Sequence, residues 1–230
     1  MRLVHPLLSA PIHWAENQIP VLIMEDPRIF REMVFDLSMQ AVGEDGPFVL
    51  SLNYEPLECT EHLQVIRDYV SLPLDDRKLQ SRFQAVLHET VRETLQQETD
   101  QLDRMIGDYL RSVAATMDYP VSFSGGEYAL PLLKAVKCQP VLDGDSPLER
   151  LMQYFELYAG LTKDPVFVLV SAKSYFDNEE LRQLYQMVNY QKWKILLLEN
   201  RSAERLSGEA SYIIDRHLCE IRLDFDEKEL

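Results

Sequence analysis

Short apolar runs alternate with amphipathic stretches over most of the chain, in an order that predicts strands and helices in turn. Residues 21–24 form an apolar run of strand length, and a helix is predicted from Pro27 to about Gln40. Asp26 suits the start of that helix because its carboxylate can accept a backbone N–H, and Pro27 fits the first helical position. Further strands are predicted at residues 2–4 and 12–15, as a hairpin, and at 48–52.

The second half of the chain repeats this alternation. Ser146 and Glu149 have the spacing of a capping box, which opens a helix predicted to end near Gly160. Residues 166–170 and 195–198 are continuous apolar runs, as expected for strands covered on both faces of a parallel sheet. The same signals predict a helix from Asp177 and strands at 212–214 and 220–223. This order of elements predicts an α/β fold with a doubly wound, mostly parallel sheet.

The middle of the chain has a different period. Between residues 79 and 117 apolar positions recur every four residues, which is the spacing of amphipathic helices. A polar patch at 96–101 interrupts the pattern, so the stretch predicts two long helices or one helix broken near Thr99. A single helix over 76–118 would extend roughly 60 Å. Two interpretations stay open: a helix pair folded on itself, or an arm that packs against a second subunit.

Composition limits where a polyanion could bind. The 230 residues are enough for one or two domains with their own cores, but 23 Lys and Arg stand against 38 Asp and Glu, which gives a net charge of -15. The segments 1–55, 56–138 and 139–230 are each acidic overall. Because binding to nucleic acid depends on clustered Lys and Arg, any contact with DNA must come from a local face.

No nucleotide-phosphate loop accompanies the predicted α/β fold. The pattern GxxxxGK[ST], in which backbone amides and a lysine hold phosphates, does not occur. The first apolar strand leads instead into Glu25 and Asp26, whose carboxylates repel phosphate. Gly125 and Gly126 precede a further stretch that could be helical and could hold an anion at its start, although a simple turn explains them as well.

Other catalytic patterns are missing as well. The histidines are scattered, and neither HExxH nor GxSxG occurs. Cys59, Cys138 and Cys219 are widely spaced without a CxxC, so neither a disulfide framework nor a zinc site is expected. We therefore predict no catalytic residues and no enzymatic activity. The first residues lack the pattern of a secretory leader and no apolar run approaches a membrane span, so a cytoplasmic protein is expected.

Several strings resemble one known family in their order and spacing. The chain is similar to the Csn-two family of type II-A CRISPR loci over nearly its whole length, with the best match between Leu148 and Arg201. The resemblance rests on residues 20–26, Glu149-Arg150, 166–170, Ser174-Tyr175-Phe176, Glu180, Gln183-Leu184, 195–199 and Arg201.

This resemblance implies an α/β head related to P-loop ATPases, over residues 1–57 and 139–230, with a helical leg domain inserted at 58–138. It implies a homotetrameric ring that binds the ends of double-stranded DNA without sequence specificity. It also implies a role in spacer acquisition, with the CRISPR integrase proteins and the effector nuclease as partners. The chain would thus be an accessory protein of CRISPR adaptation.

The resemblance also indicates candidate residues for binding DNA and calcium. Lys134 and Arg150 correspond to basic positions of the family, and Lys137, Arg182, Lys192 and Lys194 are further candidates for DNA contact. Members of the family often bind calcium through a run of acidic residues, but here Asp118 and Glu127 are the only acidic residues between 118 and 127. Because Ca²⁺ takes about six to eight oxygen ligands, several of them anionic, we expect weak or no calcium dependence.

Two other functions are compatible with the predicted scaffold. One is a nucleotide-dependent or small-molecule enzyme on the same α/β fold, and the other is a protein-interaction scaffold with no role on DNA. Binding to linear duplex across a salt series separates the ring protein from both.

Overall fold

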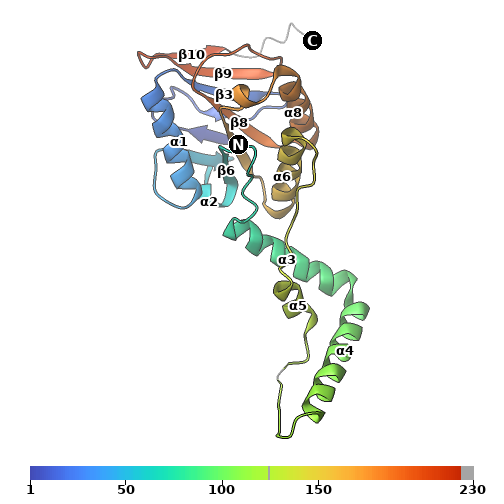
Figure 1. Cartoon of the computed structure of the whole chain (residues 1–230). Helices are drawn as coiled ribbons and strands as arrows, with labels where there is room; N and C mark the ends of the chain where they lie inside the picture. Colours follow the sequence, from blue (N-terminus) through green and yellow to red (C-terminus); the bar gives the residue numbers. More distant parts are fainter. Residues whose placement is uncertain (124, 224–230) are drawn as a thin grey trace. The chain divides into compact units, whose positions relative to one another are not determined.

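The computed structural model describes residues 1–123 and 125–223 and contains two compact units (Figure 1). The head unit comprises Met1–Leu72 and Leu142–Leu230, and the leg unit is Pro73–Val141. The sequence had suggested 58–138 for the inserted segment. In the structure β6 (Leu63–Ile66) pairs with β7 (Val166–Val170), so residues 63–66 belong to the sheet of the head.

A six-stranded sheet forms the centre of the head. Its order is β10-β9-β3-β8-β7-β6, with β3 (Ile19–Met24), β8 (Lys194–Glu199), β9 (Glu209–Ile214) and β10 (Glu220–Leu223) completing the set. All neighbours pair in parallel except β10, which runs antiparallel to β9. The prediction of an α/β fold with a mostly parallel sheet is therefore confirmed. Strand β6 was not predicted, because an edge strand of four residues with two half-buried positions lacks a continuous apolar run.

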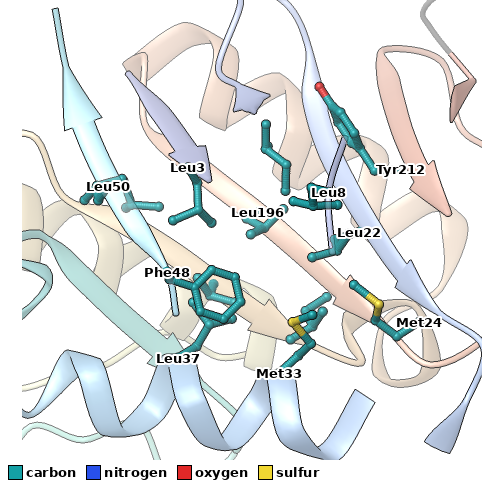
Figure 2. Packing of buried hydrophobic residues seen from close by; sticks show 14 of the residues in the cluster. Leu3, Leu8, Leu22, Met24, Met33, Leu37, Phe48, Leu50, Leu196 and Tyr212 are labelled. Atoms are coloured by element: carbon teal, nitrogen blue, oxygen red, sulfur yellow. The ribbon is translucent and has the colours of Figure 1, made fainter. Parts of the chain in front are cut away.

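Helices and a small second sheet cover the two faces of this sheet (Figure 1). On one face lie α1 (Pro27–Ala41) and the four-stranded sheet β2-β1-β4-β5. Figure 2 shows Met33 and Leu37 of α1, with Leu3 and Leu50 of the small sheet, packed against Leu22 and Leu196 of the central strands. The small sheet consists of β1 (Arg2–Val4), β2 (Ile12–His13), β4 (Val49–Leu52) and β5 (Glu55–Leu57).

The opposite face is covered by α6 (Pro147–Leu161) and α8 (Asn178–Gln191) (Figure 1). Phe155 of α6 stacks on Phe167 of β7 with ring centroids 4.1 Å apart. Both helices begin with the predicted capping boxes, at Ser146 with Glu149 and at Asp177 with Glu180. Two short helices, α2 (Cys59–His62) and α7 (Ala172–Tyr175), complete the head. Among the described residues, no helix is both long and apolar enough to cross a membrane.

The leg unit consists of α3 (Arg77–Thr94), α4 (Gln96–Ala115) and α5 (Ala129–Ala135). Leu95 ends α3 and precedes α4 with non-helical angles, so the predicted break lies four residues before Thr99 and produces two helices. Helix α4 leads away from the end of α3 instead of folding back along it (Figure 1). Helix α5 follows further along the chain, and its backbone N–H of Ala129 donates to Asp103 of α4 at 2.8 Å.

A buried ionic cluster lies beneath α8 in the head. Lys173 Nζ is 2.7 Å from Glu209 Oε2, and the Lys173 backbone N–H donates to Glu199 Oε1 at 3.0 Å. The Tyr185 hydroxyl donates to the other oxygen of Glu209 at 2.7 Å. Burial raises the pKa of Glu199 to about 7, and the negative charge of Glu209 nearby adds to the rise. The cluster ties α7 and the segment before β9 to the sheet, since Lys173 also donates to the carbonyl of Glu204.

We expect Glu199→Gln to stabilise the protein at about pH 8 and to have little effect at about pH 5. The pKa of Glu199 in the folded state lies above the ordinary value of 4.5. The fold favours the neutral carboxyl of Glu199. The stability that this preference gives is complete below the pKa of the group in the unfolded state, and it is lost as the pH rises through about 7. The gain on substitution has an upper limit of about 3 kcal/mol. Urea unfolding at both pH values measures it, with the exposed Glu32→Gln as the control. An equal gain at both pH values would contradict the assignment.

Candidate nucleic-acid interface

The cations of the leg are separated from its acidic residues along the sequence. Residues 77–88, the first two thirds of α3, contain Arg77, Lys78 and Arg82 and no acidic residue. Residues 128–142, which include α5, contain Lys134 and Lys137 and again no acidic residue. The leg's acidic side chains fall mainly on the end of α3 and on α4. Each basic segment is therefore positive although the leg as a whole is not.

The structure brings these two segments together. Gln84 of α3 donates through Nε2 to the carbonyl of Cys138 at 2.8 Å. At the other end of the contact, Ala129 and Leu130 line a cavity of about 290 Å³ together with Val91. The segment from α5 onward thus runs antiparallel to α3, beside its basic half. We call the five cations of these segments the leg basic strip: Arg77, Lys78, Arg82, Lys134 and Lys137. Arg77, Lys134 and Lys137 are exposed, whereas Lys78 and Arg82 are half-buried and the Lys78 Nζ atom is buried.

The end of α5 presents the two lysines of this strip. The Lys137 N–H donates to the carbonyl of Lys134 at 3.1 Å, and Lys137 itself has the left-handed φ of 53° that commonly follows a helix. The Cys138 N–H donates to the carbonyl of Leu133 at 3.1 Å, which completes the turn. Both lysines are exposed. Like charges this close together create a local positive potential that attracts phosphate within a Debye length of about 10 Å.

The four candidate cations of the head do not lie together in the described structure. Helices α6 and α8 both run against the direction of the strands, because α6 leads into β7 and α8 leads into β8. Arg150 and Arg182, near the helix starts, therefore lie at one edge of the sheet, and Lys192 and Lys194 lie at the other. Arg182 and Lys192 are ten residues apart along α8 and its C-cap, which corresponds to roughly 15 Å.

Three of these four head cations are also less available for contact with DNA than the sequence suggests. Lys194 Nζ is 2.8 Å from Asp164 Oδ1, and this hydrogen bond lowers the pKa of Asp164. Arg182 lies 3.4 Å from Glu179. Arg150 is half-buried, and its Nε has no hydrogen-bond partner among the described residues. Lys192 is exposed and has no partner in the described part of the chain.

Sequence reasoning had missed Arg77, Lys78 and Arg82 as candidate contacts. Residues 56–138 are acidic overall, because the acidic residues of α4 outweigh the basic start of α3. The available signal was the acid-free run at 77–88. Only the antiparallel packing of two such runs shows that they lie side by side.

The candidate calcium ligands do not form one cluster. Glu127 lines cavities of about 500 and 290 Å³ with Asp100 and Asp103, whereas Asp118 lines neither. Asp103 Oδ1 already accepts the backbone N–H groups of Tyr128 and Ala129, at 2.7 and 2.8 Å. The chain's own carboxylate thus occupies the helix start at which a bound anion had been considered. Within residues 1–123 and 125–223, no three His, Cys, Asp or Glu side chains are grouped as metal ligands.

A family model described as CRISPR-associated protein (Cas_Csn2) matches residues 40–218, well over half of the chain. The chain belongs to the Cas_Csn2 family. The resemblance inferred from the residues is therefore confirmed, and with it a CRISPR-associated role. No curated protein matches the chain. The Cas_Csn2 match includes the whole leg unit, and therefore both segments of the leg basic strip.

We expect this Cas_Csn2 protein to show no stoichiometric calcium binding in titration calorimetry. Asp103 is committed to two backbone N–H groups, and Asp118 lies outside the cavities that Glu127 lines. Asp100 and Glu127 are then the remaining carboxylates that line these cavities, and Ca²⁺ takes about six to eight oxygen ligands, several of them anionic. Saturable heat at one calcium per chain, abolished by Glu127→Gln, would contradict this prediction.

Proposed function

We propose that this Cas_Csn2 protein is a non-catalytic accessory of spacer acquisition, acting in the cytoplasm as a homotetrameric ring that binds double-stranded DNA ends. The observation that carries the proposal is the leg basic strip. A chain with a net charge of -15 repels DNA on average, so the exposed cations of the strip, Arg77, Lys134 and Lys137, mark the place where binding can occur. Family membership supports the CRISPR setting, and the integrase proteins and effector nuclease are the proposed partners.

The chemistry of the strip favours binding without sequence specificity. Lys and Arg side chains on an exposed surface contact phosphates, which position a protein on a duplex without identifying bases. Reading bases needs an element that enters a groove, whereas α3 is packed along the segment after α5 through Gln84. Affinity should therefore fall steeply with salt, as counterion release requires.

The exposed face of α4 supports assembly. The helix has regularly spaced apolar residues, yet Gly107 is its only buried residue among those described. Met105 and Tyr109, one turn apart, are 62% and 68% exposed. Exposed apolar side chains arranged in this way mark protein contacts. A second copy of the chain is the proposed occupant, since a ring requires contacts between identical subunits.

The head supports a non-catalytic role on a P-loop-like scaffold. In such scaffolds, phosphates bind where the first strand meets the next helix. Here Asp26 follows β3, and its Oδ1 accepts the Arg28 backbone N–H at 2.7 Å. A carboxylate at the start of α1 repels the phosphate that an NTPase would bind there. The absence of ATP hydrolysis by the purified protein is the corresponding expectation.

We expect the double substitution Lys134→Glu with Lys137→Glu to weaken binding to linear duplex at least about tenfold. The salt slope should fall by about 1 for each phosphate that the variant no longer neutralises. Both effects arise because the change replaces attraction by repulsion at the end of the strip. Fluorescence anisotropy across a salt series measures them. Linear duplex should also bind better than a closed circle, because a ring is threaded from an end.

The matched control is Lys163→Glu with Arg216→Glu, which makes the same change in net charge at exposed positions of the head. Equal reductions of affinity in the two double variants would refute the strip as the interface. Such a result would indicate that the affinity for duplex depends only on the net charge of the protein.

We expect the native protein to have a mass near four times 26.8 kDa in solution, and Met105→Glu with Tyr109→Glu to dissociate it. New charges on the exposed face of α4 would be buried unpaired in an interface between subunits. Light scattering coupled to size exclusion measures the mass. Phe35→Glu, at a 62% exposed position on α1, is the control that should keep the tetramer. A monomeric native protein would leave the ring without support.

A further inference from the structure

Both tryptophans of the chain line one cavity in the head. The cavity measures about 340 Å³ and lies between the segment that precedes β3 and the junction of α8 with β8. Trp14 is held in place because its Nε1 donates to the carbonyl of Ile195 at 2.6 Å. Trp193 is held by edge contact with Phe155, with ring centroids 5.5 Å apart. A cavity of this size with two fixed indole rings is suited to a small planar ligand.

The polar side chains of this cavity are not used by the protein. Asn17, Gln18 and Asn189 line it, and within the described residues none of their carboxamides has a hydrogen-bond partner. The exposed ammonium of Lys192 also has no partner there, in contrast to Lys194, which is paired with Asp164. Glu16 adds one carboxylate to the lining. The cavity therefore offers aromatic faces, amide donors and acceptors, one free cation and one anion.

We propose that this cavity binds a nucleotide. Indole rings stack on bases, and Asn and Gln side chains pair with the donors and acceptors at base edges. The Lys192 ammonium suits the phosphate, and the Glu16 carboxylate suits a sugar hydroxyl or an exocyclic amino group of the base. A purely apolar ligand would leave all three carboxamides unpaired. An inorganic anion would leave both indoles without a contact.

The location distinguishes this site from the usual nucleotide site of an α/β sheet. Such sites lie beyond the carboxyl ends of the strands, where Asp26 stands in this protein. The cavity lies at the opposite edge, beside Ile19 at the start of β3 and Ile195 near the start of β8. The ligand has two sources with the same chemistry: a free mononucleotide, or an unpaired nucleotide at the end of DNA. Only the second source rests on the proposed function.

Tryptophan fluorescence reports on binding to this cavity, because no tryptophan lies elsewhere in the chain. Titration with deoxyadenosine monophosphate should quench the tryptophan emission and saturate in the micromolar to millimolar range. Lys192→Gln should weaken the monophosphate about fivefold to tenfold and leave deoxyadenosine unchanged, because the nucleoside lacks the phosphate. Arg216→Gln, at the other edge of the sheet, removes the same charge and is the control. Inorganic phosphate alone should not quench.

Two further measurements distinguish a free mononucleotide from an unpaired nucleotide at the end of DNA as the ligand. A duplex with a single-stranded 3′ overhang that quenches more than a blunt duplex assigns the site to DNA ends. Quenching by the monophosphate that survives in Lys134→Glu with Lys137→Glu shows that the site works independently of the leg basic strip. No quenching by the monophosphate or the overhang, or equal quenching in the wild type and Lys192→Gln, would overturn the proposal.

Discussion

Burial of the central strands on both faces is the constraint on which the head depends. All six residues of β3 are buried, as are five of the six residues of β8. Successive side chains of a strand point to opposite faces, so each of these strands needs two covers. Helix α1 with the small sheet supplies one, and α6 with α8 supplies the other (Figure 2 shows the first). Truncating a core residue such as Leu196 to alanine would destabilise the head by about 2–5 kcal/mol.

The chain repeatedly uses its own carboxylates where an anion could otherwise bind to backbone N–H groups. Asp26 does so at the start of α1, and Asp103 does so at the start of α5. Asp177 caps α8 in the same way. Internal caps of this kind stabilise the helix starts and remove them as phosphate sites. In the proposed function, binding of DNA is thereby left to Lys and Arg side chains, which is consistent with positioning by phosphates alone.

Positive and negative charges are unevenly distributed within the leg. The acidic residues of the leg lie mainly on the end of α3 and on α4, and the cations lie on two segments that the fold places side by side. The exposed apolar side chains of α4 are on a different part of the same unit. The proposed surfaces for phosphate and for other subunits are therefore different parts of one small unit. The tryptophan-lined cavity, the proposed nucleotide site, belongs to the head.

Local signals determined much of the fold. Asp26 with Pro27 and the capping boxes at Ser146 and Asp177 fixed three helix starts, because a cap needs only neighbouring residues. Continuous apolar runs identified β7 and β8 as strands buried on both faces, and the family followed from the order of such strings. The sequence did not predict strand β6, because a short edge strand is recognisable only from its pairing with β7.

Tertiary structure decided the candidate sites, because each depends on residues that are distant in the sequence. The segment that contains Lys134 and Lys137 lies beside α3 only through the antiparallel contact between them. Lys194 proved to be engaged by Asp164, thirty positions away, and the sequence contains no signal for that ion pair. Trp14 and Trp193 share one cavity because β3 and β8 are neighbours in the sheet. The sequence by itself determined which segments are helices, strands and local charge runs, whereas long-range packing decided which of them meet.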